Sequence, residues 1–320
     1  MRVHVFSIPL RNTFRGINVR EGVLIDADGK WAEWSPFVEY DDEIAARWLR
    51  GTLDQLTENR TPVRDRVSVN VTIPEVSPDT AYELVTTSGC KTAKVKVAGS
   101  SSLTEDAERV RAVRQAIGPQ GHVRVDANGS WSLEEALEAL EILGEVGLEY
   151  AEQPCASVED LARLRKELAK SGLAVPVAAD ESIRRAEDPL RVAALDAADV
   201  VVLKVQPLGG AAKVLELAEQ LAPRKVVISS ALETSVGIHA SLKAACELPD
   251  APLACGINTV RLFTGDVVRN PLIAKDGELV LGETPTPTDE LLEEFAAPKP
   301  RARWWKDRLQ RCRERIKEQA

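Results

Sequence analysis

Hydrophobic and polar positions change their pattern along the chain near residue 62. Before this point we expect three short strands and one amphipathic helix, at 3–8, 22–27, 31–34 and 42–56. Asp28 and Gly29 supply the turn residues of a hairpin between the second and third strands. The pattern predicts a small α+β domain over residues 1–62.

Apolar strand-like runs alternate with helical periods from residue 63 to residue 260. The expected strands are 67–73, 93–97, 123–126, 148–152, 175–180, 200–205, 226–229 and a weak one at 253–257. Helical periods lie between them at 104–117, 133–146, 158–171 and 211–221. Eight strands with intervening helices predict a closed α/β barrel of the TIM type. An open doubly wound sheet is the rival fold, but no G-x-G-x-x-G follows an early strand.

Residues 261–320 lose this alternation, and we expect them to return to the N-terminal block and complete a smaller cap domain. The stretch 299–320 holds nine Lys or Arg against three Asp or Glu, with apolar residues at roughly helical spacing. It predicts a basic helix that either packs on its own domain or binds a partner.

Composition and charge narrow the class of protein. The chain has 320 residues, 44% of them hydrophobic, and a formal net charge of −9, which argues against a nucleic-acid partner. No apolar run of membrane-spanning length and no signal-peptide pattern are present, so we expect no membrane partner. The five cysteines form no C-x-x-C pair, which indicates reduced thiols in a cytoplasmic protein. The oligomeric state stays open, with a monomer favoured.

Ionisable residues stand at the C-terminal ends of five successive expected strands. Lys94 and Lys96 are two positions apart in one strand, so both side chains point into the barrel. One residue ends each of the next four strands, at intervals of 24 to 30 residues: Asp126, Glu152, Asp180 and Lys204. This interval matches one βα unit, and barrel active sites form at the C-terminal face.

Each of these residues alone has an ordinary explanation. Asp126 fits a helix N-cap, Glu152 a surface ion pair and Lys204 a solvated strand end. The ordered set instead favours a catalytic site. Its three carboxylates predict a hard oxygen site for Mg²⁺, with Mn²⁺ as a substitute, and the three histidines lie away from these ends, which argues against zinc.

In this order the motifs resemble those of the enolase superfamily. They are Lys94-Val95-Lys96, Asp126-Ala127-Asn128, Glu152-Gln153-Pro154, Asp180-Glu181-Ser182 and Lys204. The resemblance implies a modified (β/α)8 barrel, (β/α)7β, with the lysine pair on the second strand and metal ligands ending the third, fourth and fifth. We expect Lys96 to be the base that takes a proton next to a carboxylate, and Lys94 to tune it. Lys204 either stabilises the enediolate as an ammonium group or acts as a second acid or base.

Within the superfamily, three further segments resemble the o-succinylbenzoate synthases of menaquinone biosynthesis. They are Thr13-Phe14-Arg15-Gly16, the run from Ser229 to Ser235 and the run from Cys255 to Thr259. The resemblance implies a carbon–oxygen lyase that dehydrates 2-succinyl-6-hydroxy-2,4-cyclohexadiene-1-carboxylate to 2-succinylbenzoate. It also implies that Ser230 and Gly256, with Ser229 beside them, hold the succinyl carboxylate. N-acylamino acid racemases and dipeptide epimerases share the same ionisable groups, so that activity is the alternative.

Asn128 and Arg15 have two interpretations each, and Glu181 has one. Asn128 either orients a ligand or substrate or makes a loop turn before Gly129. Arg15 either covers the mouth of the site or lies on a plain surface loop, and Glu181 is expected behind the metal. Two other classes also remain: a metal-free barrel lyase with a Schiff-base lysine, and a non-catalytic binding protein.

Overall fold

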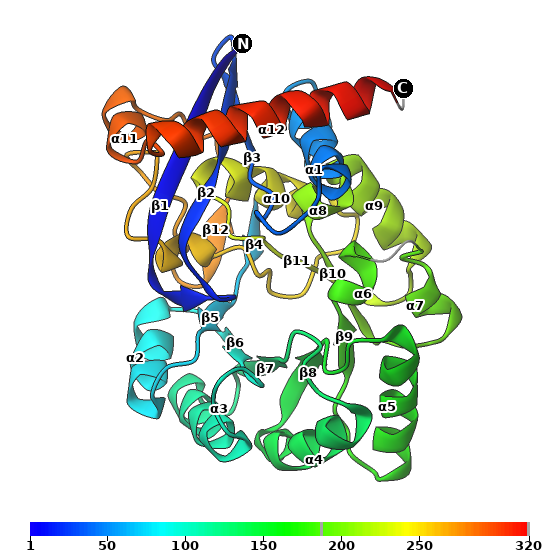
Figure 1. Ribbon diagram of the computed structural model, residues 1–320. Coiled ribbons are helices and arrows are strands. Elements are labelled where there is room, and N and C mark those ends of the chain that lie inside the picture. The colour runs from blue at the N-terminus through cyan, green and yellow to red at the C-terminus, as the bar shows by residue number, and fades with distance from the viewer. Residues whose placement is uncertain (186–187, 319–320) are drawn as a thin grey trace.

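A parallel seven-stranded sheet, curled into a barrel, forms the centre of the computed structural model, which describes residues 1–185 and 188–318 (Figure 1). Each strand pairs in parallel with the next one along the chain. The strands are β5 (Val71–Ile73), β6 (Thr92–Lys96), β7 (His122–Asp126), β8 (Leu148–Glu152), β9 (Val177–Ala179), β10 (Val200–Leu203) and β11 (Lys225–Ile228). The α/β barrel predicted from the sequence is confirmed.

The eighth barrel strand is reduced to two bridges that link the ends of the sheet. Cys255 pairs in parallel with Val69, and Gly256 pairs in parallel with Ser229. The predicted first strand, 67–73, is split into β4 (Arg66–Ser68) and β5. The reason is that β4 pairs antiparallel with β12 (Glu278–Val280), so residues after 261 return first to the barrel and only then to the cap.

Helices cover the outside of the barrel (Figure 1). Those predicted from periodicity are α3 (Leu103–Ile117), α4 (Leu133–Leu143), α5 (Val158–Lys170) and α9 (Ala211–Gln220), and α4 continues into a short 3₁₀ turn, Gly144–Val146. Capping boxes at Ser102 and Ser132 fix where α3 and α4 begin. The sequence did not reveal α2 (Pro78–Ser88), α7 (Arg191–Ala194) or α10 (Ser235–Glu247). Only Ala240 and Lys243 of α10 escape burial, so it shows no amphipathic period.

Two short helices begin directly at the ends of the barrel strands. They are α6 (Glu181–Arg184), which follows Asp180, and α8 (Val205–Leu208), which follows Lys204. A second 3₁₀ turn, Thr259–Leu262, follows the eighth strand. These turns keep the strand-end side chains at the C-terminal face of the barrel.

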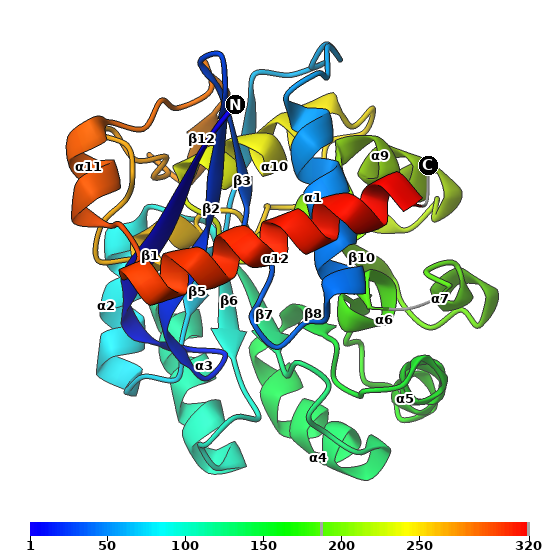
Figure 2. The ribbon, with the colours of Figure 1, turned by 45° about the horizontal axis from the view of Figure 1, so that its top comes forward.

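The cap combines both ends of the chain. Its sheet is β1 (Arg2–Phe14), β2 (Ile17–Ala27) and β3 (Lys30–Trp34), packed with α1 (Asp42–Gln55), α11 (Asp289–Glu294) and α12 (Lys299–Glu318). Both β1 and β2 are longer than predicted and carry their turn down to the barrel mouth (Figures 1 and 2).

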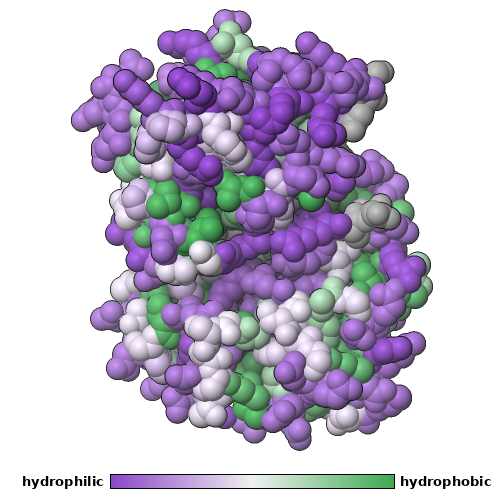
Figure 3. Space-filling model, in the orientation of Figure 1, coloured by the Kyte–Doolittle hydropathy of each residue, from purple (hydrophilic) through white to green (hydrophobic). Residues whose placement is uncertain are grey.

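The basic helix α12 packs on its own domain. It crosses the cap beside α1 and β1, and its Trp305 meets Trp34 edge to face at a centroid separation of 5.6 Å (Figure 2). Leu309 and Cys312 are buried on the same side, whereas the top of the molecule, where the helix lies, is mostly hydrophilic (Figure 3). In the part of the chain that the structure describes, no helix combines the length and the hydropathy that a membrane span requires. The domain boundaries at 62/63 and 260/261 stay predictions.

Candidate active site

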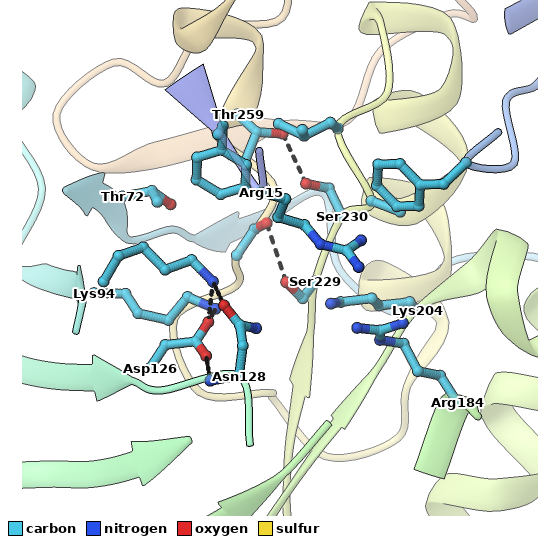
Figure 4. A pocket seen from close by; sticks show the side chains of 16 residues that line it. Arg15, Thr72, Lys94, Asp126, Asn128, Arg184, Lys204, Ser229, Ser230 and Thr259 are labelled. Atoms are coloured by element: carbon cyan, nitrogen blue, oxygen red, sulfur yellow. Dashed lines mark hydrogen bonds and ion pairs between the residues drawn. The ribbon is translucent and has the colours of Figure 1, made fainter. Parts of the chain in front are cut away.

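A cavity lies between the C-terminal ends of the barrel strands and the β1–β2 turn of the cap (Figure 4). Most of the site residues predicted from the sequence line it: Arg15, Lys94, Lys96, Asp126, Asn128, Lys204, Ser229, Ser230 and Gly256. Three others, Glu152, Asp180 and Glu181, do not line the cavity but bond to residues that do. The structure thus brings the predicted set together.

Lysines and carboxylates interlock on the β6–β8 side of the cavity. Lys94 Nζ lies 3.0 Å from Asp126 Oδ2 and 2.7 Å from Glu152 Oε1. Lys96 Nζ lies 2.6 Å from the same Asp126 oxygen and 2.7 Å from Asn128 Oδ1. Asn128 has a positive φ of 50°, and its backbone N–H donates to Asp126 Oδ1, so the Asp126 side chain closes the turn here, and the role of Asn128 toward a ligand or substrate stays a prediction.

The pKa values of this group follow from burial and from the crowding of charges. Burial alone would lower the pKa of Lys94, but the negative charges of Asp126 and Glu152 outweigh it and raise that pKa well above its ordinary value. Burial would raise the pKa of Asp126, but Lys94 and Lys96 hold it far below its usual range. The pKa of Glu152 rises to about 7, because the residue is buried and faces Asp126.

A second charged cluster lies on the opposite side of the cavity (Figure 4). Lys204 Nζ is 2.6 Å from Asp180 Oδ2, and Arg184 Nε is 2.9 Å from Asp180 Oδ1. Burial lowers the pKa of Lys204 despite the nearby Asp180, whereas Arg184 and Lys204 together outweigh burial and lower the pKa of Asp180. Tyr40 of the cap accepts a hydrogen bond of 3.0 Å from Arg184, which links this cluster to the cap.

The carboxylates of Asp126, Glu152 and Asp180 form the candidate metal site. As they stand, no three His, Cys, Asp or Glu side chains of residues 1–185 and 188–318 are gathered closely enough to hold a metal ion. The Lys94 ammonium lies between two of them, Asp126 and Glu152. The donor chemistry nevertheless fits a divalent cation, because three buried carboxylates stand at the ends of adjacent strands.

The remaining wall of the cavity is formed by the ends of β11 and the eighth strand. Ser230 Oγ lies 2.7 Å from Thr259 Oγ1, and Ser229 Oγ lies 3.4 Å from the Gly256 carbonyl oxygen. A Cβ at Gly256 would stand 2.6 Å from Ser229 Oγ, so a larger residue would close this part of the wall.

The cap covers the cavity with a charged and aromatic lid. Arg15, at the tip of the β1–β2 turn, stacks its guanidinium on the Phe37 ring at 4.2 Å, and Lys96 Nζ lies 5.3 Å from the centre of the Phe14 ring. Arg15 therefore lines the cavity from an exposed turn of the cap.

Several lining residues were missed from the sequence: Phe14, Phe37, Thr72, Arg184, Leu232 and Thr259. Arg184 had a weak signal, because it stands four residues after Asp180 and so shares a helical face with it. The cap residues had none, since their place over the barrel depends on long-range packing.

Two family models match most of the chain. The model described as "Enolase N-terminal domain-like" matches residues 5–55, and the one described as "Enolase C-terminal domain-like" matches residues 78–285. Among curated proteins, the o-succinylbenzoate synthase of Thermobifida fusca is 50% identical over 281 residues, 87% of each chain. That of Mycolicibacterium smegmatis is 48% identical over 315 residues, 97% of this chain and 95% of the relative.

Solved structures resemble this one at low sequence identity. The muconate lactonizing enzyme of Pseudomonas fluorescens, complexed with muconolactone, has a TM-score of 0.76 at 22% identity and covers 92% of this chain and 98% of its own. The N-succinyl Arg/Lys racemase of Bacillus cereus has a TM-score of 0.74 at 19% identity and covers 92% and 97%. At these identities the likeness establishes the fold, a barrel with a cap.

Proposed function

The chain belongs to the enolase superfamily and, within it, to the o-succinylbenzoate synthases, and on this premise we propose how its side chains carry out the reaction. The group consists of hydro-lyases, and the superfamily uses a divalent metal ion. The substrate is 2-succinyl-6-hydroxy-2,4-cyclohexadiene-1-carboxylate, which loses water to give 2-succinylbenzoate. The observation that carries the assignment of roles is the placement of a lysine pair and a third lysine around one cavity.

Lys96 is the base that takes the proton from the carbon next to the substrate carboxylate. Its Nζ borders the cavity and is held by Asp126 and Asn128, at 2.6 and 2.7 Å. Once protonated, the same ammonium group can return its proton to the departing hydroxide, so one residue serves as base and then as acid. Lys94, held between Asp126 and Glu152, stays a cation and fixes the Asp126 carboxylate beside Lys96.

Lys204 faces the substrate from the other side of the cavity as an ammonium group. Its charge stabilises the enediolate that forms when the carbon loses its proton. Asp180, at 2.6 Å, and Arg184, which shares this carboxylate, hold it in position.

Asp126, Glu152 and Asp180 are the residues that would hold the divalent ion. Their hard oxygen donors favour Mg²⁺, with Mn²⁺ as a substitute. When bound, the ion supplies positive charge to the substrate carboxylate. In this structure Lys94 and Lys204 form ion pairs with these carboxylates. In the metal-loaded enzyme each carboxylate would bind the ion either together with its lysine or in place of it. Glu181, whose buried Oε2 has no hydrogen-bond partner within the described part of the chain, stands beside this group as a supporting carboxylate.

The far end of the substrate, its succinyl carboxylate, lies against Ser230 and Gly256. Support comes from the hydroxyl pair Ser230–Thr259 and from the space that the missing side chain of Gly256 leaves next to Ser229. Arg15 adds positive charge from the cap side.

The test compares two substrates with the purified protein and Mg²⁺. We expect a higher kcat/KM for dehydration of the cyclohexadiene than for racemisation of an N-succinylamino acid, since forming an aromatic ring makes the first reaction strongly downhill. The placement of Lys204 on the opposite side of the cavity is the observation that favours racemisation as a second candidate. A reversed ranking of the two kcat/KM values would assign the chain to that activity.

We also propose a reducing, cytoplasmic setting, supported by five cysteines that are all free thiols. The net charge of −9 supports a small-molecule substrate without a nucleic-acid partner.

A further inference from the structure

A buried polar cluster joins the cap to the barrel outside the cavity. At its centre is Arg20 on β2, only 2% exposed. Its Nε donates to the Leu232 carbonyl oxygen at 2.9 Å, and one terminal nitrogen donates to the Ala231 carbonyl oxygen at 3.1 Å and to that of Ser35. The guanidinium also stacks on the ring of Phe37, at 4.4 Å.

The carbonyl groups that Arg20 holds belong to the wall of the cavity. Ala231 and Leu232 both line it and directly follow Ser230. Leu232 has a φ of 61°, a left-handed conformation that is unfavourable for a branched side chain and persists only where the surroundings fix it. Arg20 bonds to this residue from the cap, so part of that fixing comes from outside the barrel.

A second cap residue holds the same segment further along. Glu33 on β3 is fully buried, and its Oε2 accepts hydrogen bonds from the backbone N–H groups of Thr234 at 3.0 Å and Gly237 at 3.2 Å. These groups lie at the N-terminus of α10. The segment 231–237 is therefore held at both ends by cap side chains.

Stability alone does not account for a buried guanidinium in this place. The hydrogen bonds of Arg20 go to the backbone carbonyl oxygens of Glu21, Ser35, Ala231 and Leu232, and burial lowers its pKa to about 10. Glu33 and Glu233 lie near enough to act on Arg20 electrostatically, so removal of this charge alone also costs stability, which the experiment below has to separate from positioning. What an apolar residue cannot do is set the position of two adjacent carbonyl groups.

We propose that Arg20 is a positioning residue, which acts through the backbone of Ala231 and Leu232 to set the wall that binds the end of the substrate remote from the reacting carbon. The inference rests on the proposed function, because it assigns that wall to the succinyl end. Binding of that end is shared by ground state and transition state, so its loss raises KM more than it lowers kcat.

The experiment compares Arg20→Met with Arg114→Met. Arg114 is a matched control because it also donates to backbone carbonyls, those of Val146, Gly118, Gly121 and Gly147, but does not line the cavity. Arg20→Met is expected to raise KM for the cyclohexadiene at least tenfold with kcat within about threefold. Arg114→Met should lower Tm without changing KM.

Two further measurements separate positioning from a structural role. In combination with Ser230→Ala, Arg20→Met should add little to the KM of the single Ser230 variant, because both act on the same wall. Amide hydrogen exchange of the 229–238 segment, without substrate, should be faster in Arg20→Met than in the wild type or Arg114→Met. Arg20→Lys, which keeps the charge but not the two-carbonyl fork, should show a smaller rise in KM and stands in if Arg20→Met does not fold.

The outcomes are distinct. A wild type that does not turn over the cyclohexadiene refutes the proposed function, and the exchange measurement then still decides the inference. An active, folded Arg20 variant with wild-type KM, or with unchanged exchange in the 229–238 segment, overturns the inference and leaves the proposed function standing.

Discussion

At the scale of single residues, the lysines of the site have opposite electrostatic surroundings. Lys94 lies between two carboxylates, which raise its pKa, whereas burial lowers the pKa of Lys204. The first is therefore a permanent cation, and the second gives up its proton more easily than an ordinary lysine. Lys94 is thus excluded as the base. The first chemical question is whether Lys96 alone transfers the proton or whether Lys204 also does.

Arginine substitutions separate a proton-transfer role from a purely electrostatic one. Arginine keeps the positive charge but stays protonated at working pH. Lys96→Arg should therefore abolish dehydration and the exchange of the substrate α-hydrogen with solvent deuterium. Lys204→Arg should retain measurable dehydration, with a loss of about 10²–10³-fold. A folded, metal-loaded Lys204→Arg that is as inactive as Lys96→Arg in both assays would make Lys204 an obligatory proton-transfer group.

Removal of the metal tests the three carboxylates. EDTA should abolish turnover, because chelation removes the main source of positive charge beside the substrate carboxylate. Added Mg²⁺ or Mn²⁺ should restore turnover. Asp180→Asn should weaken metal binding, measured by titration calorimetry, without unfolding the barrel. Full activity after exhaustive chelation would exclude a metal-dependent reaction.

The charged residues of the site could be found from the sequence because they share one position in a repeated unit, the end of a strand. Arg184 gave only a weak signal, and Thr259 stood only as the last residue of the run from Cys255 to Thr259, since both follow strand ends in short helical turns that have no period of their own. Phe37 and Arg20 belong to the cap, and only the docking of cap on barrel brings Phe37 to the cavity and Arg20 to the backbone behind its wall.

At the scale of elements, α1 of the cap meets the start of α9 at two glycines, Gly51 and Gly210, so neither side has a side chain at the closest contact. A Cβ at Gly51 of α1 would stand 2.4 Å from the Gly210 backbone nitrogen, just before α9. The cap can therefore seat on the barrel only with glycine here. This requirement for glycine cannot be seen in the sequence, because there Gly51 is only a residue of low helix propensity inside a helix.

An alanine at this position should push the cap away from the barrel. Gly51→Ala is expected to cost about 1–3 kcal/mol of unfolding free energy, because backbone atoms cannot move aside as a flexible side chain would. Gly282→Ala is the control, since its added Cβ would meet nothing within 4 Å. Urea unfolding of both variants measures the difference. Equal stability of the two would show that the helices separate easily.

At the scale of the whole molecule, a barrel that the sequence predicts strand by strand is joined to a cap built from both ends of the chain. Alternation and spacing identified the seven paired strands because short, mostly buried segments recur at the interval of one βα unit. For the C-terminal segment the spacing of apolar residues predicted the helix α12, whereas β12, which returns to the barrel, followed from no pattern. The junction between these parts holds buried acids, and this gives the molecule a pH-dependent stability.

Glu33 at that junction should make the protein less stable as the pH rises. Burial, with Glu233 nearby, raises its pKa to about 8, from an ordinary value of 4.5. The folded state thus binds a proton more tightly than the unfolded state, so this contribution is complete below pH 4.5 and is lost as the pH rises to 8. Glu33→Gln should flatten the fall in Tm between pH 5 and 8 by roughly 2 °C or more.

An exposed acid provides the control for this measurement. Glu290, whose side chain is 81% exposed, should leave the pH dependence of Tm unchanged when replaced by glutamine. A Glu33→Gln profile parallel to the wild type from pH 5 to pH 8 would contradict the assignment.

The packing of Trp34 against Trp305 has a consequence for co-translational folding. The first cap strands leave the exit tunnel long before α12 exists, and translation of the intervening chain takes on the order of tens of seconds. During that time the barrel can assemble, but the hydrophobic side of β1–β3 stays partly uncovered until α12 has been synthesised. A nascent chain that stalls before α12 therefore carries every ionisable group of the active site under an incomplete cover, and it offers chaperones the cap sheet as their target.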